Sequence, residues 1–422
     1  MKRRELILSS SFLTALSAGC LRLTEDQGSS ADTERTSTAG DTDSKGTATA
    51  DDTATGRTSV DDTTETTTSG GSVGLTERWS LERDVRTWND TARTVTDGNR
   101  LYFTAGYEDG SVAAVDVDDG STVWERPKPA RLVFDVVHRD GELYLLGSDG
   151  GVTVLDAADG TRNWSVDNPF SSRSDSDDPL WPGGLAVSAE RVVASIYDID
   201  SDGDYSYVYA VDRAVRTVDW EIESETIAGY AERDFLAASG ISPIVDGTVF
   251  VGFSRVLLSI EVRSGTVNWA REVPCEGPVT VTEDSVFVPG GGRLYSIRKS
   301  DGETQWRKEN NASEGPNFVS ELVVADGTVY ACGRDTDVYA LDQQDGAERW
   351  TAETGGLILV GPAVTESIVW AGSRDGRLYA FDRSSGSQLL NELVQAPVVG
   401  FEHSDGVLMA LTDGDVSAYT IE

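Results

Sequence analysis

From residue 75 onwards, apolar and polar residues alternate along the chain in short segments. Examples are GNRLYFTAG (98–106), GELYLLGS (141–148), GTVFVGFS (247–254) and GVLMALTD (406–413), each bounded by Gly, Asp or Ser. A period of two between turn-forming residues predicts β-strands that are buried on one face or both. No segment shows a sustained helical period, so we predict an all-β protein.

A second pattern follows each of these strands. In VYALDQQDGAERW (338–350), Gly346 lies four positions after Asp342, and Trp350 lies four positions after Gly346. The same spacing recurs in four further copies: Asp116-Gly120-Trp124, Asp156-Gly160-Trp164, Glu261-Gly265-Trp269 and Arg298-Gly302-Trp306. Two copies are degraded, with Arg216 in place of the glycine and Leu390 in place of the tryptophan. All-strand repeats of this length predict a β-propeller rather than a solenoid.

The two ends of the repeat region predict how the ring closes. The last unit, residues 406–422, stops before any tryptophan, whereas the first, residues 75–83, has Trp79 but no strand before it. Each end supplies what the other lacks. We therefore expect the N-terminal strand to complete the last blade, which gives an eight-bladed propeller over residues 75–422 without a free edge there.

The repeated acidic-Gly-Trp pattern resembles the PQQ-type (quinoprotein-like) propeller repeat. The glycine is expected to have a positive φ in a tight hairpin, and the tryptophan to cover the seam to the next blade. The resemblance implies two functional kinds. One is the quinoprotein dehydrogenase, with PQQ and calcium in the central funnel, and the other is the non-catalytic binding propeller of BamB-like lipoproteins.

The residues favour the non-catalytic kind. The chain has 3 cysteines and 2 histidines, with no adjacent cysteine pair and no Cys-x-x-Cys-His haem site. Cys275 and Cys332 are expected to be buried free thiols, although the sequence leaves a bridge between them open. His138 and His403 lack a partner at ligand spacing and are expected to be structural. We predict no catalytic residues and regard PQQ as an unlikely cofactor; a PQQ-dependent dehydrogenase remains the alternative.

The first 74 residues predict export and anchoring. Residues 1–20, MKRRELILSSSFLTALSAGC, have a basic start with Arg3-Arg4 and a short apolar run, which resembles a twin-arginine signal peptide. Ser17-Ala18-Gly19-Cys20 resembles a lipobox, with Cys20 as the lipidated residue. Residues 21–74 are rich in Thr, Ser, Asp and Gly and have no aromatic residue, so we predict a disordered linker. The expected location is the outer face of the cytoplasmic membrane.

Charge adds two further expectations. The chain has 72 Asp and Glu against 35 Lys and Arg, a formal net charge of −37. So acidic a surface stays hydrated but repels itself unless salt screens it, which predicts a halophilic, haloarchaeal source. It also excludes nucleic acid as a natural partner, because phosphates need cationic side chains. We expect a monomer that meets an unidentified extracytoplasmic protein.

The candidate binding face comes from three insertions in one part of the repeat, at residues 168–184, 197–207 and 225–240. If strands alternate in direction, the three insertions emerge on one face of neighbouring blades. They bring the aromatic residues Trp181, Tyr197, Tyr205, Tyr230 and Phe235. Aromatic loops on a rigid scaffold are a usual recognition surface. We predict a protein-binding platform or assembly scaffold; a carbohydrate-binding face and loops that only pack on themselves are the alternatives.

One insertion carries possible metal ligands. Asp198, Asp200, Asp202 and Gly203 match the first half of an Asp-x-Asp-x-Asp-Gly calcium loop, with Asp204 at its seventh position. The twelfth position is Tyr209, so the bidentate glutamate of an EF-hand is absent. Calcium binding by Asp198, Asp200, Asp202 and Asp204 and mere solvation of an acidic turn both remain open from the sequence.

Overall fold

The computed structural model describes residues 73–83, 85, 93–106, 110–131, 133–171, 180–200, 203–227, 238–309, 321–394 and 396–422. For residues 134, 181, 182, 198–200, 203–205, 225 and 238 it describes the backbone alone. The predicted signal, Cys20 and residues 21–72 of the predicted linker lie outside the described residues. Among the residues described, no helix has both the length and the apolar character that crossing a bilayer requires.

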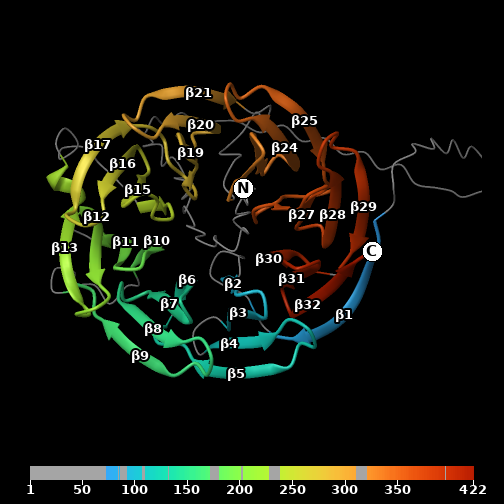
Figure 1. The fold of residues 1–422 in the computed structure, drawn as a ribbon, viewed down its shortest axis with the longest axis horizontal. Coiled ribbons are helices and arrows are strands. Elements are labelled where there is room, and N and C mark those ends of the chain that lie inside the picture. Colours follow the sequence, from blue (N-terminus) through green and yellow to red (C-terminus); the bar gives the residue numbers. More distant parts are fainter. Residues whose placement is uncertain are drawn as a thin grey trace, which may run out of the picture. The chain divides into compact units, whose positions relative to one another are not determined.

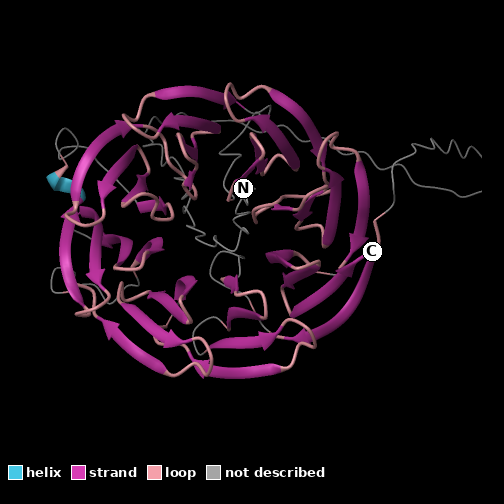
Figure 2. Ribbon diagram, in the orientation of Figure 1, coloured by secondary structure: helices cyan, strands magenta, loops and turns pink. Residues whose placement is uncertain are grey.

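Eight four-stranded antiparallel sheets surround a central axis (Figures 1 and 2). In each blade we name the strands A to D, from the axis outwards. Blade 1 is β2 (Thr94–Thr96), β3 (Arg100–Ala105), β4 (Ser111–Asp116) and β5 (Thr122–Pro127); blade 2 is β6 (Val133–Arg139), β7 (Glu142–Gly147), β8 (Val152–Asp156) and β9 (Arg162–Val166). Blade 3 is β10 (Trp181–Val187), β11 (Arg191–Asp200), β12 (Gly203–Asp212) and β13 (Thr217–Glu223), followed by the 3₁₀ turn η1 (Ser224–Thr226).

The remaining blades follow in the order of the chain. Blade 4 is β14 (Ala238–Ile241), β15 (Thr248–Phe253), β16 (Val256–Glu261) and β17 (Thr266–Glu272); blade 5 is β18 (Thr280–Val281), β19 (Ser285–Gly290), β20 (Arg293–Arg298) and β21 (Thr304–Glu309). Blade 6 is β22 (Val323–Ala325), β23 (Thr328–Cys332), β24 (Asp337–Asp342) and β25 (Glu348–Glu353); blade 7 is β26 (Ala363–Val364), β27 (Ile368–Gly372), β28 (Arg377–Asp382) and β29 (Gln388–Leu393). Blade 8 is β30 (Val398–Ser404), β31 (Val407–Thr412), β32 (Asp415–Ile421) and β1 (Leu75–Glu82).

The ring closes as the two sequence ends predict. Strand β1, from the start of the propeller, pairs along its length with β32, from its end, and supplies the outer strand of blade 8. The Thr76 hydroxyl donates to Oε1 of Glu422 at 2.6 Å, which fixes the far end of this pairing. The predicted eight blades and the closing N-terminal strand are therefore confirmed. Closure removes the exposed strand edge that an open sheet would present.

The tryptophan and glycine of the repeat meet across every regular seam. Six indole Nε1 groups donate to a carbonyl oxygen in the C–D turn of the next blade, at 2.7 to 3.1 Å; the pairs are Trp79 to Val117, Trp124 to Ala157, Trp220 to Val262, Trp269 to Lys299, Trp306 to Gln343 and Trp350 to Arg383. The turn glycine lies beneath each indole. At Gly346, for example, φ is +71° and an added methyl group would lie 2.7 Å from Trp306 Cε3. The expected structural roles of both residues are confirmed.

The degraded copies keep the geometry with other residues. Arg216 has φ +61° at the position where the other turns have glycine. Its backbone N–H donates to the Asp212 carbonyl at 2.7 Å, the same closure that Gly346 makes on Asp342. Leu390 is half-buried in the place of a tryptophan. The fold therefore tolerates a single departure from the repeat, because the strands on either side still impose the turn.

The core lies in the seams rather than within the blades. Strands B and C contribute side chains to clusters shared by two neighbouring blades, for example Tyr102, Ala114 and Trp124 of blade 1 with Leu143 and Leu145 of blade 2. Each blade is thus stabilised mainly by its two neighbours, which is the general behaviour of repeat architectures.

The cysteines and histidines belong to this core. Cys275 and Cys332 are free and fully buried, in different clusters, so the interpretation of both as free thiols is confirmed. Burial raises the pKa of both thiols, which makes them poor nucleophiles. His138 stacks on Tyr102 with ring centroids 5.6 Å apart. Burial lowers the pKa of His138 and of His403, so both favour the neutral form.

Candidate functional site

The strand ends that flank the three insertions lie at one face of the ring. Residues 168–184 and 225–240 join strand D of one blade to strand A of the next, and residues 197–207 join strands B and C of blade 3. Because the strands alternate in direction, D–A and B–C connections lie at the same end of the sheets. We call this end the D–A face, and the opposite end, with the A–B and C–D turns, the A–B face.

The distinguishing feature of the D–A face is a long hairpin in blade 3. Strands β11 and β12 have 10 residues each. The corresponding strands β15 and β16 of blade 4 have 6 each. The extra length forms a two-stranded ribbon that ends in the pair Asp200↔Gly203. At about 3.3 Å per residue, it extends the hairpin by roughly 10 Å beyond its neighbours.

The five aromatic residues predicted for this face do not all lie on it. Tyr197 is 4% exposed and packs in the core cluster between blades 3 and 4. The expectation that Tyr197 lies on the binding surface is therefore wrong, because strand B continues through this residue and turns it into the seam. Trp181 and Tyr205 lie in β10 and β12 with side chains outside the description. Tyr230 and Phe235 lie outside the described residues.

The predicted calcium ligands belong to the hairpin rather than to a separate loop. Asp198 and Asp200 lie in β11 and Asp204 lies in β12, where it pairs with Ile199. Asp202 lies in the turn outside the described residues, and the other three carboxylates lie outside the described side chains. Among the side chains that are described, no group of three or more His, Cys, Asp or Glu residues is placed to hold a metal ion. Calcium binding by these four aspartates stays a prediction.

A second candidate site lies on the A strands, nearest the axis. Thr104 N–H donates to the Arg93 carbonyl at 3.1 Å, and Asp135 pairs with Leu146. The same register places Glu321 opposite Cys332. These three ionisable residues therefore occupy equivalent positions in blades 1, 2 and 6. The other five blades have glycine or proline there: Gly184, Gly240, Pro278, Gly361 and Gly400. We call these eight positions the inner ring.

The inner-ring charges are buried. Arg93, Asp135 and Glu321 are 3%, 1% and 8% exposed. Asp135 accepts hydrogen bonds from Leu185 N–H at 2.7 Å and Val136 N–H at 2.9 Å. Oε1 of Glu321 is buried without a hydrogen-bond partner. Burial of an ionisable group without full compensation costs free energy, so these residues are not explained by stability alone.

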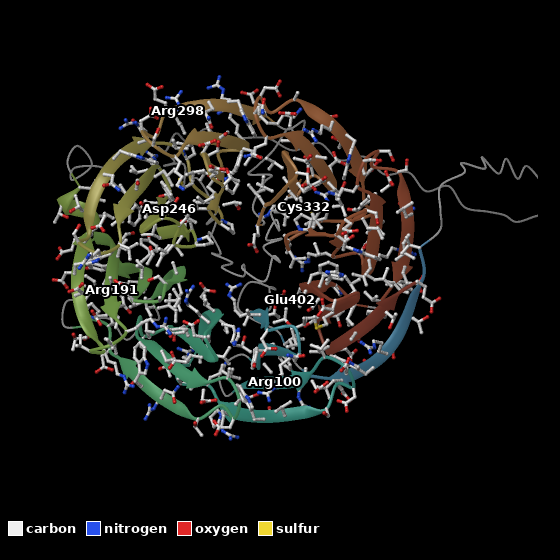
Figure 3. All side chains as sticks on the ribbon, in the orientation of Figure 1. Arg100, Arg191, Asp246, Arg298, Cys332 and Glu402 are labelled. Atoms are coloured by element: carbon white, nitrogen blue, oxygen red, sulfur yellow. The ribbon has the colours of Figure 1, made fainter. Side chains whose placement is uncertain are left out.

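The electrostatics of the inner ring follow from that burial. Burial raises the pKa of Asp135 to about 7, against its backbone hydrogen bonds and the charge of Arg93. Burial, with the negative charges of Glu402 and Asp135, raises the pKa of Glu321 well above its ordinary value. Glu402 lies beside the ring on β30 (Figure 3), and burial raises its pKa to about 7 although it accepts a hydrogen bond from the Thr94 hydroxyl at 2.9 Å. Burial lowers the pKa of Arg93 to about 10.

The inner ring can bind a proton or a cationic group, but it holds no nucleophile beside a base. Sequence reasoning missed it because the A strands are short and show little periodicity. The available signal was alignment of the blades: RTVT (93–96), DVVH (135–138) and ELVV (321–324) begin with a charge where the other blades have glycine or proline. Only the fold shows that these three segments converge on one axis (Figure 1).

Comparisons with known proteins agree with this architecture. The structure of BamB from Moraxella catarrhalis matches with a TM-score of 0.58 and 18% identity, over 82% of this chain and 98% of that one. Quinohemoprotein alcohol dehydrogenase from Comamonas testosteroni matches with a TM-score of 0.63 and 15% identity, over 82% and 76%. At these identities the likeness shows the fold alone, and the same fold serves an assembly factor and an enzyme.

The sequence comparisons point to one family. Outer membrane protein assembly factor BamB from Yersinia pestis is 24% identical over 249 residues, which is 57% of this chain and 60% of that protein. The matched part thus spans less than two thirds of the relative's length. A family model described as outer membrane protein assembly factor BamB matches residues 44–273, 204–356, 259–397 and 334–422. The chain therefore belongs to the BamB family of PQQ-like β-propellers.

Proposed function

We propose that this protein is a non-catalytic, exported β-propeller, anchored to the membrane through Cys20, that binds another protein on its D–A face at blade 3. One observation carries the proposal: the blade 3 hairpin extends beyond the strands on both sides of it. The relatives that are named as assembly factors support a role in protein binding. Their own partners are not transferred to this chain.

The hairpin has open edges that suit an incoming strand. The last pair of β10 with β11 is Trp181↔Tyr197, and the last pair of β13 with β12 is Tyr207↔Glu223. Among the residues described, residues 198–200 and 203–205 pair only with each other. No other described strand pairs with the second edge of either segment, and exposed strand edges are a recurrent site for an added peptide segment.

The charge of the hairpin specifies the partner further. Its tip carries Asp198, Asp200, Asp202 and Asp204 within seven residues. An acidic ribbon attracts a segment with lysine or arginine side chains, and charge complementarity speeds and orients the encounter. Trp181, Tyr205, Tyr230 and Phe235 are the aromatic candidates for apolar contacts beside it. If the Asp side chains bind calcium, the metal would order the tip.

Cross-linking of the membrane-anchored protein in strong salt, followed by mass spectrometry, tests the proposal. The reagent should react with carboxylates, because the hairpin is rich in aspartate. We expect one extracytoplasmic protein to cross-link stoichiometrically at residues 198–205. Cross-links spread over the other blades, with none at the hairpin, would contradict the proposal.

Two variants make the test specific. Replacing residues 199–204 with Asn-Gly shortens the hairpin to a two-residue turn between Asp198 and Tyr205, which pair in the native register. Capture of the partner should be lost. The matched control places Asn-Gly at Ser254-Arg255, the B–C turn of blade 4, and should bind normally. Equal binding of the partner by both variants would exclude the blade 3 hairpin as the binding site.

A quinoprotein dehydrogenase is the second candidate, because the inner ring places buried carboxyl groups with raised pKa values on the axis. The described residues do not fit the calcium that such a cofactor needs, since Asp135, Glu321 and Glu402 do not form a metal-ligand group. We therefore derive no catalytic step. Absorbance of a quinone in the purified protein, with dye-linked alcohol oxidation, would establish the enzyme and overturn the non-catalytic proposal.

A further inference from the structure

A pocket of about 770 Å³ opens on the A–B face at the seam between blades 4 and 5. It is lined on the blade 4 side by Thr248, Ser259 and Asn268 and on the blade 5 side by Lys299 and Gln305. Beneath it lie the rings of Phe250 and Trp269, with centroids 5.6 Å apart, and both side chains are buried. Its volume is in the range of small-molecule sites.

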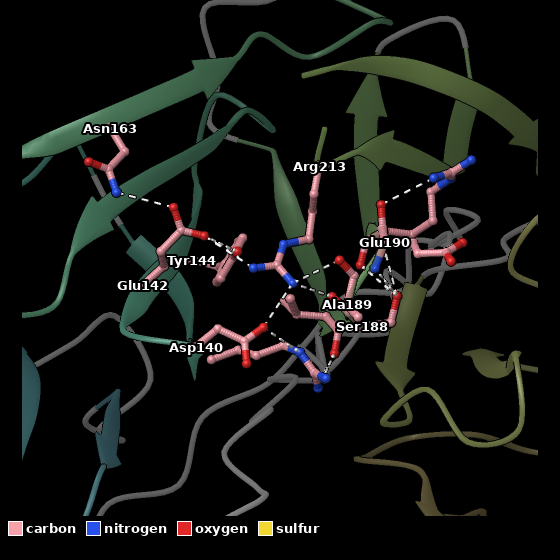
Figure 4. Close-up of polar contacts among 11 residues, drawn as sticks. Asp140, Glu142, Tyr144, Asn163, Ser188, Ala189, Glu190 and Arg213 are labelled. Atoms are coloured by element: carbon pink, nitrogen blue, oxygen red, sulfur yellow. Dashed lines mark hydrogen bonds and ion pairs between the residues drawn. The ribbon is translucent and has the colours of Figure 1, made fainter. Parts of the chain in front are cut away.

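The seam between blades 2 and 3 shows how this space is filled elsewhere (Figure 4). There the Arg213 guanidinium lies 5.2 Å from the centre of the Tyr144 ring and donates to Glu142 at 3.2 Å and to the Ser188 carbonyl at 2.7 Å. Asn163 donates to the other oxygen of Glu142 at 3.1 Å. The large side chains of this seam hydrogen-bond to one another and to the backbone.

At the seam between blades 4 and 5, equivalent positions hold smaller side chains. By strand register, Thr248 replaces Glu142, Phe250 replaces Tyr144 and Ser259 replaces Val154. In the C–D turn, Lys299 replaces Arg213. It pairs with Asp246 at 3.0 Å, as Arg213 pairs with Asp140 at 3.2 Å, but Thr248 offers it no carboxylate in the place of Glu142. Asn268 keeps the place of Asn163. The pocket between blades 4 and 5 therefore results from smaller side chains at these positions, because the strand register is the same in both seams.

The lining of the pocket has hydrogen-bonding capacity to spare. Asn268 makes only a long bond of 3.4 Å, to the Ser259 hydroxyl. Oε1 of Gln305 accepts from Ser285 and Ser296, which turns its amide nitrogen away from them as an available donor. Within the described part of the chain, no partner is recorded for the Thr248 hydroxyl or the Asn268 carbonyl oxygen. The lining of the pocket thus includes the Thr248 hydroxyl, the Gln305 amide as a donor and the Asn268 carbonyl oxygen as an acceptor.

The charges around the pocket are of both signs, and its cations are already paired. Arg298 pairs with Asp301 at 2.7 Å and with Glu303 at 2.9 Å, and Lys299 pairs with Asp246. Glu283 and Asp284 lie at the exposed rim as acceptors. With its cations paired, the pocket does not favour an anion, whereas a neutral molecule rich in hydroxyl groups would find hydrogen-bond donors and acceptors. The carboxylates at the rim make a cation the competing ligand.

We propose that the pocket between blades 4 and 5 binds a neutral sugar unit through Thr248, Asn268 and Gln305. The site is independent of protein binding at the D–A face, because it lies at the opposite end of the sheets. Mixed amide, hydroxyl and carboxylate groups match the many hydroxyls of a sugar, each of which can donate and accept hydrogen bonds.

Saturation-transfer NMR on the purified full-length protein tests this proposal with D-glucose, D-galactose, D-mannose, N-acetylglucosamine and trehalose. We expect at least one sugar to bind with a dissociation constant on the order of 1 mM. Asn268→Ala should weaken it about tenfold, the effect of losing one to two well-placed hydrogen bonds. The matched control, Asn163→Ala in the filled seam, should leave binding unchanged.

A filling variant keeps the test independent of lost stability. Thr248→Glu with Phe250→Tyr restores the residues that the chain itself uses between blades 2 and 3, so it should fold and lose sugar binding. Absence of saturation transfer from every sugar would overturn the proposal. So would equal weakening by Asn268→Ala and Asn163→Ala, or binding of inorganic phosphate or spermidine in preference to all five sugars.

Discussion

Two sets of equivalent positions run around this propeller, and the chain treats them differently. At the outer seams, one blade's tryptophan lies on the next blade's turn glycine, with the same indole-to-carbonyl hydrogen bond in six blades. At the inner ring, five blades have glycine or proline, but Arg93, Asp135 and Glu321 stand in the others. Residues that repeat hold the fold together, and ionisable residues that break a repeat mark positions where stability is not the only requirement.

The largest effect should come from the outer seam. Trp306→Ala removes the hydrogen bond to Gln343, the contact with Phe287 and the cover over Gly346. We expect the free energy of unfolding to fall by about 4 kcal/mol. Guanidinium chloride denaturation, with tryptophan-independent circular dichroism as the probe, measures it. Leu390→Ala, at the same repeat position in blade 7, should cost about 2 kcal/mol; equal costs would mean that the indole has no special role.

The glycine of the seam should come next. Gly346→Ala must keep a left-handed φ of +71° and bring its methyl group to 2.7 Å from Trp306. Strain and overpacking together should lower the free energy of unfolding by about 3 kcal/mol. Gly247 has φ +72° with nothing within 4 Å of an added methyl group. Gly247→Ala should therefore cost only about 1 kcal/mol, and a similar loss in both variants would remove the packing explanation.

These seam residues could be predicted from the sequence because one spacing recurs many times and the physical role of each residue is local. The blade count followed from the complementary ends of the repeat. Tyr197 was misplaced because the pattern identifies an insertion but not whether its residues continue a strand, and here strand B carries the ring into the seam. The pocket at Thr248 and Asn268 could not be predicted, since it depends on which side chains in two blades leave space between them.

The buried carboxyl group of Glu402, beside the inner ring, should respond to pH in the opposite sense from a seam carboxylate. Burial raises the pKa of Glu402 from its ordinary 4.5 to about 7, so the folded state binds more protons than the unfolded state between these pH values. The free energy of unfolding therefore falls as pH rises through this window. Glu402→Gln cannot titrate and can still accept the Thr94 hydrogen bond. We expect it to be more stable than the native protein by about 3 kcal/mol at pH 8, with little difference at pH 4.

Glu142 supplies the contrast for that experiment. Burial opposes its ionisation, but hydrogen bonds from Tyr144, Arg213 and Asn163 outweigh burial and lower its pKa. Its stabilising contribution is present above the unfolded pKa and is lost as pH falls through the folded one. Glu142→Gln should therefore be less stable than the native protein at pH 8. Denaturation curves at a series of pH values in constant strong salt measure both variants. If both substitutions changed the free energy of unfolding at pH 8 in the same direction, the distinction between Glu142 and Glu402 would be contradicted.

The smallest effect tests whether a break in the outer repeat has a cost. Arg216 has φ +61° where the regular turns have glycine, and a side chain there costs about 1–2 kcal/mol of backbone strain. Glycine relieves that strain but gains freedom in the unfolded chain, which offsets about 0.4–1 kcal/mol. Arg216→Gly should therefore raise the free energy of unfolding by about 0.5 kcal/mol. Arg216→Ala keeps the Cβ atom and should gain nothing; a gain for alanine as large as for glycine would place the cost in the arginine side chain and not in the broken repeat.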